Sequence, residues 1–366
     1  MIRAERPSGG ERYFDAKFRP EKMRLFGGAI KVVDITPEIP NPNKPRPVIE
    51  VPGWSTNLDA SKGTLRVLEG KGRQVLSLTH MRHGGEVHMA YEEITERVTE
   101  RLTAQQVDEI TIAKNLAEQD DRWQFLLHNF SEVSLRRAMT LLGVIEAKGI
   151  EKADILAQSE GAIDAVIAKY LCPDKIGDFV VVAPGGMLGE DSARRIAKGN
   201  LKQVQLESKN NQPLPYSLTG DKERDAEFAD KRNTMLEDHV TPLQSALNVT
   251  GYVGSNVVRA FNEARAIAQP VDFLFKAARR EGSKITVIHG VGDPVFPMDE
   301  MQRRGKFTVD KYRNGKLVDR GSVDGFISVK GHHGMLFIDH RLMELADHAF
   351  TMMANPPQKE EGLTLW

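Results

Sequence analysis

The segment ADILAQSEGAIDAVIAKYL, residues 153–171, contains the pattern that decides the fold. Its first residues form a short apolar run typical of a buried strand, and AIDAVIAKYL has the character of a helix. Ser159 lies at the junction, with the small residues Ala157 and Gly161 two positions away on either side. A sharp strand-to-helix turn of this kind projects a serine Oγ and directs the N-terminal N–H groups of the helix toward it. The alternative is an ordinary N-cap serine.

The rest of the chain repeats the alternation of strand and helix. Strands are predicted at 48–54, 73–80, 178–185, 284–290 and 325–331, and helices at 58–72, 103–118, 131–148, 271–282 and from near 334 to before Asn355. Residues 23–36 predict two short strands around a Gly-Gly turn, and Asn314-Gly315 predicts a hairpin. Alternating strands and helices predict an α/β fold, with a mostly parallel sheet covered on both faces.

Residues 187–268 interrupt this pattern, because they are charged and helical and contain no convincing strand. Connections in α/β units are typically about 2–6 residues long, so this stretch is expected to be an inserted subdomain. The predicted organisation is an N-terminal extension (1–22), a core (23–186 and 269–355), a helical cap insertion (187–268) and a C-terminal tail (356–366).

Two further strand ends carry side chains suited to catalysis. Asp293 follows the strand ITVIHG, and a carboxylate there can accept from a histidine Nδ1–H. His332 and His333 follow the strand FISVK between two glycines, and histidine is the natural general base near pH 7. The plainer explanations are a turn aspartate before proline and a surface-loop histidine. The glycine directly before His332 favours it as the base, with His333 as the alternative.

The chain order Ser, Asp, His resembles that of α/β-hydrolase fold serine hydrolases of the esterase and lipase type with a helical cap. The resemblance covers roughly residues 23–355 and depends on VPGW at 51–54, AQSEG at 157–161, HGVGDPVFP at 289–297 and GHHG at 331–334. It differs from the usual pattern at Ala157, where a glycine is common, and at Pro52, where a histidine is common. It implies a catalytic triad of Ser159, Asp293 and His332. The two N–H groups of its oxyanion hole would be those of Trp54 and Glu160. The residues expected to line the substrate site are Trp54, Met187 and Leu188.

The resemblance implies a serine hydrolase that cleaves a carboxylic ester or related acyl compound through an acyl-enzyme, without a cofactor. The helical insertion is expected to roof the cleft. The same triad also serves hydrolysis of carbon–carbon bonds, lactones or amides, and acyl transfer. A ligand-binding protein without turnover on the same fold is a further alternative. The substrate and the oligomeric state stay open.

Composition excludes several other classes of protein. Fifty Lys and Arg residues against 51 Asp and Glu residues give a formal net charge of -1, without the basic excess of a nucleic-acid binder. Cys172 is the single cysteine, and the histidines at 80, 83 and 88 complete no zinc motif, so no metal is expected. No apolar run has the length of a membrane helix and no signal peptide is expected, which predicts a cytoplasmic protein acting on a small molecule.

Overall fold

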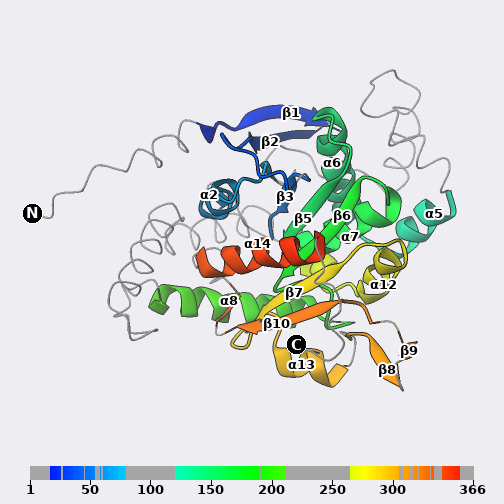
Figure 1. Cartoon of the computed structure of the whole chain (residues 1–366). Helices are drawn as coiled ribbons and strands as arrows, with labels where there is room; N and C mark the ends of the chain where they lie inside the picture. Colours follow the sequence, from blue (N-terminus) through cyan, green and yellow to red (C-terminus); the bar gives the residue numbers. More distant parts are fainter. Residues whose placement is uncertain are drawn as a thin grey trace, which may run out of the picture.

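The computed structural model describes most of the core of the chain (Figure 1). The described residues are 17–25, 28–44, 46–53, 58, 61–79, 120–189, 191–210, 264–304, 308–313, 316–319, 321–329, 331–333 and 340–354.

An eight-stranded sheet forms the centre of the fold, in the order β1-β2-β4-β3-β5-β6-β7-β10. Its strands are β1 (Glu21–Leu25), β2 (Gly28–Ile35), β3 (Val48–Val51), β4 (Val75–Leu78), β5 (Ala153–Gln158), β6 (Ile176–Val182), β7 (Ile285–Gly290) and β10 (Gly325–Val329). Pairing is antiparallel from β1 to β2 to β4 and parallel from β4 onward. The parallel strands therefore end at one common edge of the sheet, where their following loops lie.

Helices cover both faces of the sheet (Figure 1). On one face α2 (Lys62–Gly70) packs against α14 (His340–Ala354), which also contacts β6. On the other face α7 (Gly161–Leu171) packs against α5 (Asp120–Asn129), α6 (Glu132–Ala147) and α12 (Asp272–Arg280). The remaining elements are α8 (Ala193–Asn210), α13 (Met298–Arg304) and the hairpin of β8 (Lys311–Arg313) with β9 (Lys316–Asp319).

Strand β6 shows why the apolar runs become central strands. Phe179 and Val181 belong to the hydrophobic cluster that includes α6, α7 and α12, whereas Val180 and Val182 belong to the cluster that includes α2 and α14. Side chains of a strand alternate between the two faces, so a strand buried on both faces is apolar at every such position. These two clusters bury β5, β6 and β7 on both faces and so set where the loops after these strands begin.

The predicted alternation of strand and helix is confirmed wherever the structure describes it. The predicted helix at 131–148 is α6, the strand at 284–290 is β7, and the hairpin at Asn314-Gly315 is β8–β9. Helices α5 and α13 were not predicted. The predicted helix at 103–118 lies outside the described residues, as do the start of the last helix and residues 211–263 of the insertion. Among the described residues, no helix is long and apolar enough to cross a membrane.

Candidate functional site

Ser159 occupies a strained turn between β5 and α7. Its φ of 50° lies in the left-handed region, which is uncommon for any residue other than glycine and occurs disproportionately at functional sites. Two backbone hydrogen bonds impose it: Ser159 N donates to Val182 O at 3.0 Å, and Gly185 N donates to Ser159 O at 2.8 Å. The turn is thus tied to the end of β6 and the loop after it. The structure bears out the strand–turn–helix context expected for Ser159.

Two glycines allow the chain to pass close to this turn. A Cβ atom at Gly161 would lie 2.2 Å from Val51 O, so only glycine lets α7 begin so close to the end of β3. A Cβ atom at Gly53 would lie 2.9 Å from the Ser159 Cβ. The backbone after β3 is therefore a close neighbour of Ser159, as the oxyanion-hole prediction requires. Trp54 itself, the predicted donor, lies outside the described residues.

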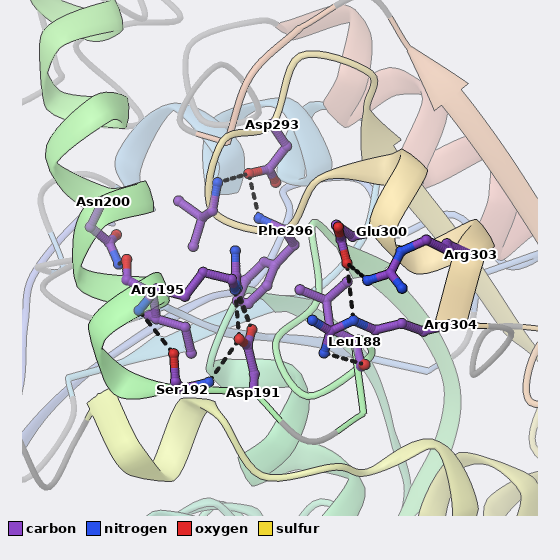
Figure 2. A network of polar contacts seen from close by, with 12 residues as sticks. Leu188, Asp191, Ser192, Arg195, Asn200, Asp293, Phe296, Glu300, Arg303 and Arg304 are labelled. Atoms are coloured by element: carbon purple, nitrogen blue, oxygen red, sulfur yellow. Dashed lines mark hydrogen bonds and ion pairs between the residues drawn. The ribbon is translucent and has the colours of Figure 1, made fainter.

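Asp293 follows β7 and is fixed by its own backbone. Its Oδ1 accepts from Val295 N–H at 2.7 Å and from Phe296 N–H at 2.9 Å, as Figure 2 shows. Its side chain is completely buried. Because Oδ1 already has two donors, Oδ2 is the oxygen available to a further partner. That partner is His333, whose Nδ1 lies 2.8 Å from Asp293 Oδ2.

The structure pairs Asp293 with His333, the alternative that the sequence left open, and not with His332, which the sequence favoured. Gly292 N–H donates to Gly331 O at 2.9 Å, so the loop after β10 is tied to the loop after β7 at Gly331. His333, the second residue after Gly331, reaches the Asp293 carboxylate, whereas His332, the first, does not. His332 instead brings its Nδ1 to 2.7 Å from Nε2 of Gln203, on α8.

The charge of Asp293 is set by its neighbours. Burial opposes ionisation, but His333 and the backbone N–H of Phe296 outweigh burial and hold the pKa of Asp293 below its ordinary value. His289, on β7, lies 3.9 Å from Asp293 and its Nε2 lies 2.8 Å from Phe296 O. Burial lowers the pKa of His289, although Asp293 acts in the other direction. The lowered pKa of Asp293 favours its charged form and the lowered pKa of His289 favours its neutral form, so Asp293 can orient a histidine.

A buried ion pair lies directly beside Ser159. The side chain of Glu160 is fully buried, and its Oε1 lies 2.5 Å from Nη1 of Arg137 on α6, which is itself 4% exposed. A single buried carboxylate at this position would be costly, and the guanidinium neutralises it. The pair also ties α6 to the residue whose backbone N–H is the predicted oxyanion donor.

The predicted lining residues Met187 and Leu188 are 0% and 2% exposed and belong to the same hydrophobic cluster as α7. Their contact with a substrate stays a prediction. Arg304 of α13 donates to Leu188 O at 3.2 Å, which ties the loop of Leu188 to the helix that follows the Asp293 turn (Figure 2). The histidines at 80, 83 and 88 lie outside the described residues, and within the described ranges no three potential metal ligands come together.

The comparison with solved structures agrees with the fold. The chain superposes on an α/β-hydrolase fold protein from Chitinophaga pinensis with a TM-score of 0.51 and 12% identity, over 93% of this chain and 98% of that one. The protein has an α/β-hydrolase fold. A membrane phospholipase A, a bacterial virulence factor, matches with a TM-score of 0.50 and 11% identity over 94% of this chain and 89% of the other. No protein-family model matches the sequence, and no curated protein does.

Within the α/β-hydrolase fold, sequence reasoning missed three residues that contact the site. They are Gln203, Arg137 and His289. His289 carried the best available signal, since it lies in the quoted segment HGVGDPVFP only four residues before Asp293. Gln203 and Arg137 carried none, because their partners are distant in the chain.

Proposed function

We propose that the protein is a serine hydrolase that cleaves a carboxylic ester or a related acyl compound, with Ser159 as nucleophile, His333 as base and Asp293 as orienting acid. The observation that carries the proposal is the 2.8 Å contact between Asp293 Oδ2 and His333 Nδ1. It joins the loops after β7 and β10, which lie at the same edge of the sheet as the strained Ser159 turn after β5. The α/β-hydrolase fold supports it further, since this is where that fold carries its functional loops.

The pairing decides how His333 would act. A charged Asp293 accepts from Nδ1–H, so the neutral imidazole has its lone pair on Nε2. Nε2 takes the proton from Ser159 Oγ as the oxygen attacks the acyl carbon, and Asp293 stabilises the imidazolium that forms. Nε2 then returns the proton to the leaving group, which departs as the acyl-enzyme is left on Ser159. Water, deprotonated by the same nitrogen, releases the acid.

The developing oxyanion would be held by backbone N–H groups. Glu160 directly follows the nucleophile and precedes α7, whose positive N-terminal end faces the same region. Trp54 would supply the second N–H after β3, in keeping with the close approach of Gly53 to Ser159. Each such donor contributes about 10²–10³ to the rate in known acyl-transfer sites.

Labelling with a fluorophosphonate tests the proposal directly. Wild-type protein is expected to gain one adduct by intact mass, whereas Ser159→Ala gains none. The matched control is Ser77→Ala, which removes another buried serine hydroxyl that lies on β4 and outside the proposed triad. Labelling of Ser159→Ala, or no labelling of folded wild-type protein, would overturn the proposal.

A panel of esters, amides and lactones measured with Ser159→Ala alongside then defines the substrate class. Ester turnover that disappears in the variant supports ester hydrolysis, and turnover limited to amides or lactones replaces it by one of the alternatives that share the triad. Saturable binding that Ser159→Ala retains, without turnover, identifies a binding protein.

A further inference from the structure

Helix α8 lies in the sequence insertion, yet one of its faces contacts both loops of the proposed acid–base pair. Gly199 and Gln203 are four residues apart and so lie on the same face of the helix. A Cβ atom at Gly199 would lie 2.6 Å from Pro294 O, so the helix backbone rests directly on the turn after Asp293.

Gln203 contacts the loop after β10 through both the oxygen and the nitrogen of its carboxamide. Its Oε1 accepts from the backbone N–H of His333 at 3.1 Å, and its Nε2 lies 2.7 Å from His332 Nδ1. The residue is only 4% exposed, so both contacts are shielded from water. A single side chain therefore joins α8 to two consecutive histidines.

These contacts fix the protonation of His332. A backbone N–H can only donate, so the amide oxygen must face His333 and the NH₂ group must face His332. An NH₂ group can only donate, so His332 Nδ1 carries a lone pair and the proton of the neutral ring is on Nε2. Charging His332 would place Nδ1–H against the NH₂ group. Burial and the neighbouring His333 also lower the pKa of His332 to about 4, against the opposing effect of Asp293.

We propose that Gln203 is a positioning residue for the reaction: it anchors the backbone of His333 and holds His332 as the neutral Nε2–H tautomer, so that His333 alone takes up the proton. The inference rests on the proposed function. A second positive charge beside His333 would oppose formation of its imidazolium, and Asp293, already shared with His333 and near His289, cannot offset both. The same face of α8 also connects the inserted segment to the loop of Asp293 and to the loop of His333.

The tautomer is measurable without any turnover. Long-range ¹H–¹⁵N spectra of protein labelled with ¹⁵N-histidine distinguish the two neutral tautomers and the charged ring, and His332→Gln assigns the resonance. We expect a neutral Nε2–H ring for His332 from pH 8 to pH 5. A neutral Nδ1–H ring, or a charged ring at pH 6, would overturn the inference.

Two substitutions of Gln203 separate its two contacts. Gln203→Leu removes both, so the His332 signal should become that of exchanging tautomers and kcat for p-nitrophenyl acetate should fall about 10- to 100-fold, with KM changed less than threefold. Gln203→Glu retains the acceptor for His333 N–H but draws a proton onto His332 Nδ1, so its kcat should lie between those of Gln203→Leu and wild type. Lys202→Leu, an exposed neighbour on the same helix, is the matched control and should behave as wild type.

The outcomes separate this inference from the proposed function. If p-nitrophenyl acetate is not turned over and Ser159 is not labelled, the proposed function fails, while the histidine spectra still test the tautomer. If Ser159 is labelled normally but Gln203→Leu matches Lys202→Leu in kcat and in the His332 spectrum, Gln203 is not a positioning residue. Equal spectra and equal kcat for Gln203→Glu and Gln203→Leu would contradict it too.

Discussion

The end of β7 and the middle of β3 each bury a carboxyl group, and the two regions treat it in opposite ways. Asp293 is 3% exposed and Glu50 is 1% exposed. Asp293 has two backbone N–H donors and a histidine, and its pKa is lowered. Burial raises the pKa of Glu50 to about 7, and the hydroxyls of Ser61 and Ser77 offset this rise only in part. The two carboxyl groups are almost equally buried, so the groups around each one decide whether its pKa is lowered or raised.

The largest expected effect is the loss of activity when the charge of Asp293 is removed. Asp293→Asn removes the negative charge and turns Oδ2 into an uncharged group, so His333 loses the partner that fixes its tautomer. We expect kcat for ester hydrolysis to fall by about 10³- to 10⁴-fold, by analogy with the same change in serine protease triads. Single-turnover kinetics at pH 8 measure it. Glu50→Gln is the control with an equally buried carboxyl, and a similar loss there would remove the distinction between the two sites.

A third buried carboxyl extends the comparison, because Glu160 is neutralised by a cation. Arg137→Met leaves the fully buried Glu160 without its guanidinium, and we expect the free energy of unfolding to fall by about 3–5 kcal/mol. Urea unfolding at pH 7 measures the change. The matched control is Arg137→Lys, which retains the charge and should lose clearly less. Equal losses in both variants would mean that the planar guanidinium, and not its charge, holds Glu160.

The charge state of Glu50 predicts a pH dependence of stability. The pKa of Glu50 rises from 4.5 unfolded to about 7 folded, so its stabilising contribution is complete below pH 4.5 and is lost as the pH rises through 7. The loss amounts to about 3 kcal/mol. Asp154, with its pKa raised to about 6, adds a loss of the same sign. Urea unfolding of wild type and Glu50→Gln at pH 4.5 and pH 8 isolates the Glu50 part, and a difference between the two proteins that is the same at both pH values would show that folding does not raise the pKa of Glu50.

The smallest expected effect concerns the hydroxyls beside Glu50. Ser77→Ala removes one group that favours the charged form, so the pKa of Glu50 should rise by less than about one unit. The wild-type minus Glu50→Gln difference in unfolding free energy, measured across pH 5 to 9 in both serine backgrounds, reports the shift. A downward shift would mean that Ser77 instead stabilises the protonated acid.

Local sequence was sufficient where one short segment contains the whole cause. The apolar run of β6 predicts a buried strand because both of its faces are covered. The strand–turn–helix context of Ser159 was predicted from the local sequence, since the strand, the small neighbours and the helix are adjacent in the chain. Helix α5 was missed because its DDRWQFLLHN sequence is strongly polar, and its place depends on packing against α6 and α7.

The sequence by itself determined the strand–helix alternation, the serine turn and the positions of Asp293 and the histidine pair. Only the tertiary structure shows which of His332 and His333 pairs with Asp293. That choice depends on the tie from Gly292 to Gly331 and on Gln203, which lies 129 residues before His332. Two adjacent histidines have nearly identical local surroundings, and they become different only when β7, β10 and α8 meet at the edge of the sheet.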